Sequence, residues 1–206
     1  MFDAALTDSR RYTSSGLEPT SDESVLARIV DVFHREFYWR ERTELVSGAD
    51  EPYYAPASSK AERHRIFSRA DYPASALHEI AHWCLAGPER RLLPDFGYWY
   101  AADGRDCEQQ REFQRVEVKP QAIEWAFSRA AGLRFQVSID NLNGEVADPF
   151  GFQLAVWQQA RRYLSAGLPP RAARFEQALR YAFSGQMPDE PCSALHLQAL
   201  CSQLEV

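Results

Sequence analysis

The sequence predicts an α+β fold, a single helix-rich domain with a small sheet. Three observations support this class. Several long stretches carry apolar residues at helical spacing, or lie between helix-capping and helix-stopping residues. Only short segments alternate apolar and polar residues or mix apolar runs with Pro and Gly. The 206 residues contain no internal repeat and have the length of about one domain.

The chain begins with a polar stretch that has no apolar pattern, residues 1–19, which we expect to be a flexible N-terminal segment. Residues 20–185 are expected to form the folded domain, and residues 186–206 a C-terminal tail. Thr20 and Glu23 fit a capping box that opens the first helix. Apolar residues then follow at helical spacing, namely Val25, Leu26, Ile29, Val30, Phe33 and Phe37.

The next elements are predicted from their turn and stop residues. Residues 45–67 mix short apolar runs with Pro and Gly, which indicates short strands and loops. A helix is predicted over residues 72–86, because Pro73 suits a first helical turn and Gly87-Pro88 is a stop signal. Both residues of that signal oppose a further turn: Gly accepts the left-handed cap, and Pro cannot continue the helix.

The second half of the chain is predicted to be mostly helical. Asp106 and Gln109 fit another capping box, which opens a helix that ends at Gly132, and Pro120 should kink this helix. The segment "LRFQVSI", residues 133–139, alternates apolar and polar residues at every step and predicts a strand. Two more helices are expected over residues 149–166 and 170–183, separated by Gly167 and a pair of prolines.

Composition and charge restrict the function. A hydrophobic fraction of 45% and a charged fraction of 25% fit a globular protein, and no apolar run approaches the ~18 residues of a membrane span. With no secretory signal pattern, we expect a cytoplasmic protein. A net charge of -6 argues against nucleic acid as a direct partner and is compatible with a cationic substrate group. The four cysteines form no C-x-x-C pair, so neither a zinc knuckle nor a redox motif is indicated.

The stretch "ALHEIAHWCLAG", residues 76–87, contains an H-E-x-x-H motif. On a helix, positions i and i+4 lie on one face about 6 Å apart, so His78 and His82 can direct their imidazoles at one metal ion. In zinc hydrolases the glutamate of this motif, here Glu79, handles a water proton. The surrounding residues are apolar, which indicates a buried helix, and buried histidines need polar partners.

A third ligand is expected from the helix that follows. Glu117, Gln121 and Glu124 form a polar stripe on an otherwise apolar segment, "RVEVKPQAIEWAF". Glu117 lies three residues before Pro120, where a side chain can be re-aimed, and is our choice of ligand. Asp103 and Asp106 are competing candidates, although a turn or a helix cap also explains them.

Two histidines and one carboxylate serve two chemistries. Zinc hydrolases use them with a water in the fourth position, and non-haem iron(II) oxygenases use them with open positions for oxygen and substrate. Ligand types alone therefore leave a zinc-dependent peptidase or nuclease open. A non-catalytic binding module with a purely structural metal is a third possibility, but structural zinc sites normally have four protein ligands.

Four segments resemble the elongation factor P hydroxylase family in order and spacing. They are "HEIAHWCLAG", "DFGYWYAADGRD", "FQRVEVKPQAIEW" and "FQVSIDNL", and the similarity extends from about residue 50 to about residue 179. The resemblance implies hydroxylation of the β-lysylated lysine of elongation factor P. It also implies a zincin-like, metal-dependent-endonuclease-like arrangement around the HExxH helix, so residues 20–185 would be a metal-dependent hydroxylase domain.

The resemblance implies an iron(II) site, or a site for another divalent metal, with molecular oxygen as the cosubstrate. Its ligands would be His78 and His82, which match the histidines of the family motif, together with Glu117, which rests on the helix argument above. Glu79 would orient a ligand or manage protons. Carboxylates could pair with the amines of the substrate, namely Glu124, Asp103 and Asp106. Tyr98, Trp99 and Tyr100 could line the channel along its methylene chain, although core packing explains them equally well.

Overall fold

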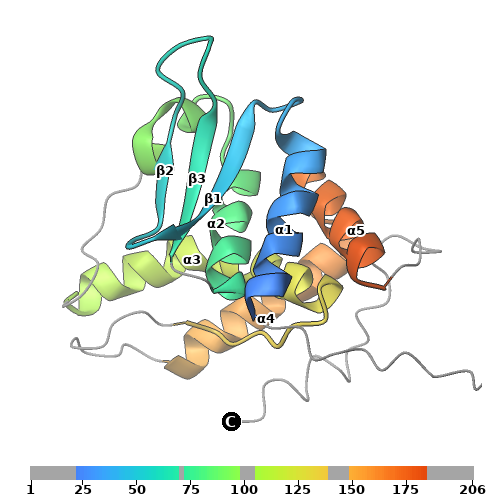
Figure 1. Ribbon diagram of the computed structural model, residues 1–206. Coiled ribbons are helices and arrows are strands. Elements are labelled where there is room, and N and C mark those ends of the chain that lie inside the picture. Colours follow the sequence, from blue (N-terminus) through green and yellow to red (C-terminus); the bar gives the residue numbers. More distant parts are fainter. Residues whose placement is uncertain (1–21, 70–71, 98–104, 139–148, 185–206) are drawn as a thin grey trace, which may run out of the picture.

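A computed structural model of the chain describes residues 22–69, 72–97, 105–138 and 149–184 (Figure 1). Helices dominate and the sheet is small, so the predicted α+β class is confirmed. The helices and strands of this part are α1 (Asp22–Phe37), β1 (Thr43–Ala49), β2 (Tyr53–Ala55), β3 (His64–Arg69), α2 (Pro73–Leu85), α3 (Cys107–Ala130), α4 (Pro149–Ala166) and α5 (Pro170–Ser184), with two short 3-10 turns, η1 (Arg90–Leu92) and η2 (Pro94–Gly97).

The sheet has three strands in the order β1-β3-β2. β1 and β3 are parallel, whereas β2 runs antiparallel to β3, with Tyr54 opposite Ile66. Alternate residues of the strands are buried, including Leu45, Tyr54 and Ile66, and α1 and α2 cover this buried face. Short strands were therefore predicted correctly in this region, but their parallel pairing depends on contacts that no local pattern contains.

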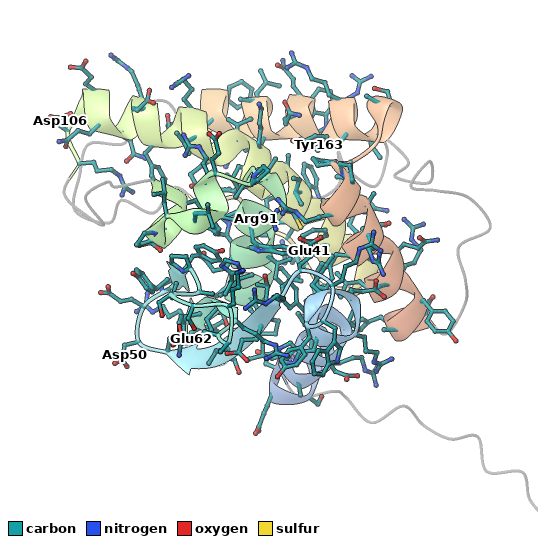
Figure 2. All side chains as sticks on the ribbon, turned by 90° about the horizontal axis from the view of Figure 1, so that it is seen from above. Glu41, Asp50, Glu62, Arg91, Asp106 and Tyr163 are labelled. Atoms are coloured by element: carbon teal, nitrogen blue, oxygen red, sulfur yellow. The ribbon has the colours of Figure 1, made fainter. Side chains whose placement is uncertain are left out.

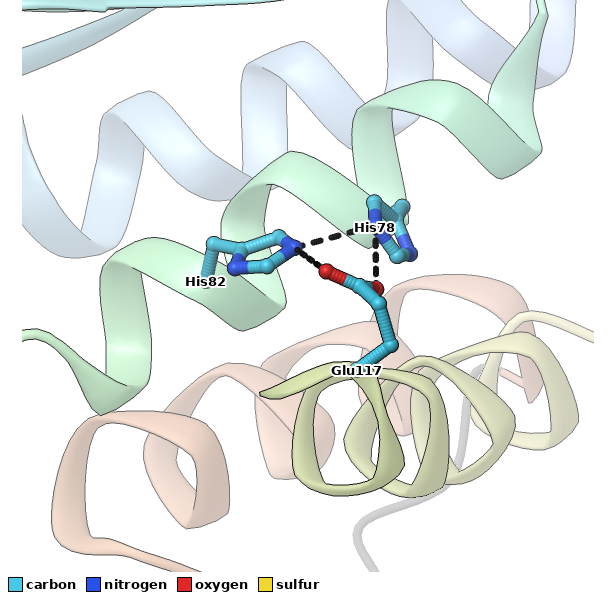
Figure 3. A group of neighbouring side chains, drawn as sticks. All are labelled: His78, His82 and Glu117. Atoms are coloured by element: carbon cyan, nitrogen blue, oxygen red, sulfur yellow. Dashed lines mark hydrogen bonds and ion pairs between the residues drawn. The ribbon is translucent and has the colours of Figure 1, made fainter. Parts of the chain in front are cut away.

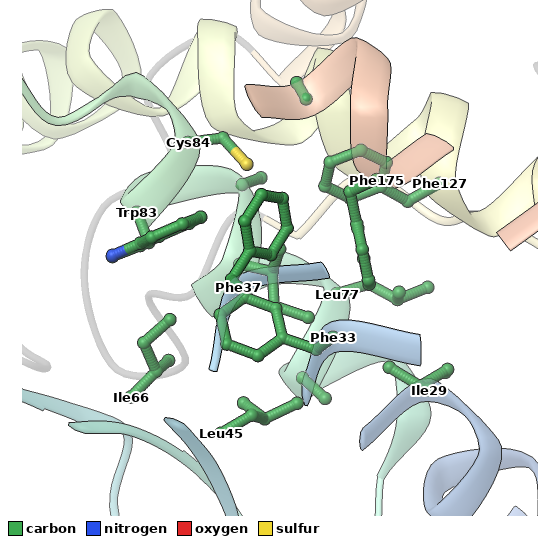
Figure 4. Close-up of a cluster of buried hydrophobic side chains, with 14 of the residues drawn as sticks. Ile29, Phe33, Phe37, Leu45, Ile66, Leu77, Trp83, Cys84, Phe127 and Phe175 are labelled. Atoms are coloured by element: carbon green, nitrogen blue, oxygen red, sulfur yellow. The ribbon is translucent and has the colours of Figure 1, made fainter. Parts of the chain in front are cut away.

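α2 is the central helix of the molecule and contacts the sheet, α1, α3 and α5. One of its faces belongs to a buried apolar cluster (Figure 4). Aromatic rings from distant segments meet there: Phe33 lies 5.3 Å from Trp83 and 5.9 Å from Phe175, in edge-to-face orientations. Such contacts favour one fixed arrangement of α1, α2 and α5.

The C-terminal end of α2 is held by a residue from the last helix. Arg171 of α5 donates hydrogen bonds to the carbonyl oxygens of Cys84, at 3.1 Å, and Ala86. Its guanidinium also lies 4.6 Å from the centre of the Trp83 ring. Because the last carbonyls of a helix have no partner within the helix, Arg171 satisfies groups that would otherwise be unpaired.

α3 confirms the predicted capping box. The Asp106 side chain accepts hydrogen bonds from the backbone N–H groups of Glu108 and Gln109, and the Gln109 side chain accepts one from the Asp106 backbone N–H. The helix is not interrupted at Pro120. It ends before Gly132, whose φ of 70° is the left-handed value that glycine accepts without strain.

The predicted strand over residues 133–139 is wrong as a strand. Residues 133–138 pair with no strand of the described chain, and Ile139 lies outside the described residues. The alternation is nevertheless real, because Phe135 is buried and Val137 is half-buried, while Arg134, Gln136 and Ser138 are exposed. The buried side chains pack against α3 and α4 in a second apolar cluster. Packing against two helices therefore buries alternate residues in the way that usually indicates a strand in a sheet.

The other predicted helices are confirmed at α1, α4 and α5. Thr20 and the expected N-terminal segment and C-terminal tail lie outside the described residues. No helix in the described ranges is both long enough and apolar enough to span a bilayer.

Candidate metal centre

α2 places two histidines on the face opposite its core residues. His78 and His82 are one turn apart, and their Nε2 atoms are 3.0 Å from each other. Two ring nitrogens can approach this closely only when a proton or a cation lies between them. The spacing of the motif therefore produces the convergence that the sequence predicted.

Glu117 of α3 completes the group (Figure 3). Its Oε2 lies 3.3 Å from His78 Nε2, and its Oε1 lies 3.2 Å from His82 Nε2. Potential ligand atoms of the three residues all lie within 4.8 Å of one another. α2 and α3 pack directly together, which brings residues that are distant in the sequence to one point.

The surroundings of Glu117 test whether this group fits a metal. Its side chain is 1% exposed, and apart from the imidazoles of His78 and His82 neither carboxylate oxygen has a polar partner among the described residues. A buried carboxylate with so few partners is costly, because water no longer stabilises its charge. A divalent cation between Glu117 and two imidazole nitrogens removes this cost, and the ligand set is one that zinc and iron(II) use. The site therefore fits a divalent metal.

The charges of the three residues depend strongly on one another. Burial alone would lower the pKa of His78, but hydrogen bonding to Glu117 and Glu124 raises the pKa well above its usual value. Burial alone would raise the pKa of Glu117, but the neighbouring His82 and His78 lower it far below its usual range. Without metal, the group therefore holds a carboxylate against protonated imidazole. A metal ion would replace that proton.

Glu124 contacts the metal group from one side. Its Oε2 lies 2.8 Å from Nδ1 of His78. If Nδ1 carries the proton and donates it, Nε2 keeps its lone pair directed at Glu117 and His82. The sequence marked Glu124 as a residue of the polar stripe but not as the partner of His78. That contact depends on the distance between α2 and α3, which no sequence pattern contains.

Glu79 lies beside the group, and burial raises the pKa of its carboxyl. The charges of His82, His78, Glu117 and Asp95 also act on it. Asp95 belongs to η2, where it has a φ of 45°, and its Oδ1 accepts a 2.7 Å hydrogen bond from the Tyr54 backbone N–H. Asp95 was not among the predicted site residues, although "PDFG" has the composition of a turn.

The expected substrate residues have different outcomes. Asp106 caps α3 and lies at the outer end of that helix in Figure 2, about 16 Å along the axis from Glu117. Its carboxylate accepts bonds from its own helix, so contact with a substrate stays a prediction. Tyr98, Trp99, Tyr100 and Asp103 lie outside the described residues.

Two histidines and one carboxylate that converge between two packed helices form a group that could hold a divalent metal ion. Comparison with known proteins identifies its family. Residues 32–191 match the model of the elongation factor P hydroxylase family. The chain is also 48% identical to the elongation factor P lysine hydroxylase of Haemophilus influenzae over 157 residues, which are 76% of this chain and 88% of that protein. The chain belongs to the elongation factor P hydroxylase family.

The family assignment confirms the expected class of enzyme, a hydroxylase that modifies elongation factor P. It does not favour the zinc hydrolase alternative. The likeness to zincins and metal-dependent endonucleases stays a prediction, as do the individual roles of the site residues.

Proposed function

We propose that this protein hydroxylates the lysine side chain of elongation factor P that carries β-lysine, with iron(II) held by His78, His82 and Glu117. The observation that supports this most strongly is the convergence of these three side chains on a buried point where, among the described residues, the Glu117 oxygens meet only the two imidazoles. The match to the hydroxylase family supports the reaction type.

The number of protein ligands supports a catalytic site. Structural zinc sites use four protein ligands, whereas catalytic sites commonly use three and bind water, oxygen or substrate in addition. In the described part of the chain, His78, His82 and Glu117 form the group that could hold a metal ion. When bound, iron(II) would supply the activation of molecular oxygen needed to hydroxylate a C–H bond.

The other residues would orient the ligands and control protons. Glu124 would accept the Nδ1 proton of His78, which keeps the Nε2 lone pair free for the metal. Glu79 would hold or move a proton beside the two histidines, because its carboxyl is close enough for their charges to affect it. The remaining oxygen of Glu124 could pair with a substrate amine, together with Asp103, while Tyr98 and Tyr100 would contact its methylene groups.

The direct test is the mass of the modified-lysine peptide of β-lysylated elongation factor P after aerobic incubation with the protein and iron(II). Ascorbate is added to the incubation as the source of the two electrons that reduce the second oxygen atom to water. We expect a gain of one oxygen atom with the wild-type protein and none with Glu117→Gln.

Glu112→Gln is the matched control, because Glu112 lies on the same helix but pairs with Arg115 on the surface. This variant should hydroxylate at the wild-type rate. If the wild-type protein adds no oxygen and contains zinc as isolated, the proposal is wrong and a hydrolytic reaction should be sought.

A further inference from the structure

Residues 133–138, which we call the 133–138 segment, run along α3 and α4 (Figure 1). The Phe135 ring stacks on Trp125 of α3, with centroids 5.2 Å apart and an interplanar angle of 18°. Val137 packs against the same cluster, and the residues between and beside them are exposed. Burial at every second residue is the pattern of an extended chain with one face against the protein.

Among the described residues, the backbone of this segment is hydrogen-bonded at its two ends only. Leu133 N–H donates to the Ser128 carbonyl at 2.7 Å. At the other end, Gln121 donates from Nε2 to the Ser138 carbonyl at 2.7 Å and accepts the Ser138 N–H at 3.1 Å. Within the described chain, no hydrogen bond reaches the backbone N–H and C=O groups of residues 134–137.

The contact with Gln121 defines the free edge of the segment. A residue that exchanges both backbone bonds with one partner has its N–H and C=O on the same edge, and the next residue has them on the opposite edge. The backbone groups of Ser138 face Gln121 on α3. Those of Val137 and Phe135 therefore point away from Gln121. An unpaired edge of this kind is a template for another extended chain.

The segment also ends close to the metal group. Gln121 lies on α3 between Glu117 and Glu124, about one helical turn from each, and its side chain is 1% exposed. The three-stranded sheet contacts α2 through β3, and the 133–138 segment packs against α3 and α4 instead. The sheet therefore does not supply a partner strand for this edge.

We propose that the edge formed by Phe135 and Val137 binds an extended segment of elongation factor P through backbone hydrogen bonds, and so places the modified lysine beside the metal. This proposal rests on the proposed function, which makes the substrate a protein. The occupant follows from the position of the edge, because a lysine side chain can reach His78 and His82 only if its own backbone is bound nearby. Addition of a strand gives affinity without requiring a particular side chain at each position.

Steady-state hydroxylation kinetics with β-lysylated elongation factor P test this edge. Val137→Pro removes one N–H from it, and Val137→Ala is the matched variant that keeps the N–H while losing part of the packing. We expect the KM of Val137→Pro to exceed that of Val137→Ala by about tenfold, the effect of one lost hydrogen bond and an unpaired partner. The kcat and Co(II) affinity should be the same in both variants. Equal KM values would overturn the proposal and leave the hydroxylase function intact.

Hydrogen exchange of the wild-type protein gives a second test that does not depend on how a variant folds. Amides of residues 134–137 should exchange fast in the free protein and become protected when β-lysylated elongation factor P is added. Protection already present in the free protein would mean that another part of this chain, or a second copy at high concentration, covers the edge. Absence of protection at saturating substrate would also overturn the proposal.

Discussion

The two faces of α2 bury side chains of opposite character. On one face, Leu77 and Ile80 are fully buried in the apolar cluster with aromatic rings of α1 and α5. On the other face, His78 and His82 meet a buried carboxylate of α3. The first face is complete without any additional component, whereas the second concentrates charge that the described residues do not fully satisfy.

This difference indicates how the fold supports the site. Burial of apolar side chains supplies stability in proportion to the area removed from water. A buried ion pair contributes little, because the cost of removing charges from water offsets their attraction. The apolar face of α2 therefore stabilises the helix. This stabilisation offsets the cost of keeping the charged groups of the polar face buried and in place.

The largest expected effect is the loss of metal binding in His82→Ala. Removing one of three ligands should lower the affinity for Co(II) by more than about 100-fold, above the effect of losing a residue that only orients a ligand. Isothermal titration calorimetry measures this. Added Co(II) should raise the unfolding temperature of the wild-type protein but not of the variant. Undiminished Co(II) affinity in the variant would remove His82 from the ligand set.

The matching change on the apolar face is Leu77→Ala, one residue before His78. We expect the free energy of unfolding to fall by about 2–5 kcal/mol, because the substitution leaves a cavity in a close-packed core. Urea denaturation gives this value. The Co(II) affinity of the folded variant should stay near that of the wild type. A large loss of affinity without a loss of stability would contradict the separation of the two faces.

A smaller effect on the polar face is expected for Glu124→Ala. This variant removes the acceptor for the Nδ1 proton of His78 and should lower metal affinity by about 10–100-fold. Glu124→Gln keeps an oxygen that can accept the same proton, so it should recover most of the affinity. If both variants bind Co(II) equally weakly, the negative charge of Glu124 matters and the orientation of His78 does not.

The smallest predicted effect concerns His64, which lies in the sheet away from the metal. Burial, with the charges of Arg91 and Arg42, lowers the pKa of His64, whose neutral Nδ1 accepts the Ala57 N–H. Its contribution is fully present above the unfolded pKa of about 6.5 and is lost as the pH falls toward the lower folded pKa.

Unfolding in urea at pH 7.5 and pH 5.5 measures this contribution. His64→Asn keeps an acceptor but cannot be protonated in this range. The wild type should therefore lose more stability on acidification than the variant. An identical loss in both proteins would exclude His64 as the source.

Local signals in the sequence predicted much of this structure. The ends of α2 and α3 were predicted because Pro73, Pro88 and the Asp106 capping box act within a few residues of a helix end. The left-handed cap expected at Gly87 was wrong, because the C-cap residue of α2, Ala86, has an extended conformation and Gly87 does not have a positive φ. The pairing of His78 with His82 follows from helical geometry alone. Glu117 could be chosen because a glutamate on an apolar helix requires a partner for its charge. The partners are the two histidines of the neighbouring helix.

The features that sequence reasoning missed depend on distances between elements. The parallel pairing of β1 with β3 and the contact of Glu124 with His78 both join segments that are far apart in the chain. The 133–138 segment was mistaken for a strand because burial of alternate residues does not specify what covers them. A side-chain amide, Gln121, occupies the place that a neighbouring strand would take at Ser138.

The arginine that holds the end of α2 has a consequence for the order in which the protein is made. Arg171 is 87 positions after Cys84, whose carbonyl it binds, and Glu117 also emerges long after the two histidines. During synthesis, α2 therefore leaves the ribosome before Glu117, which lies beside its histidines, and before Arg171, which binds the carbonyls at its end. If the three residues bind a metal ion, only the nearly complete chain can bind it, because a polypeptide released before α5 would lack the contacts that hold the end of α2.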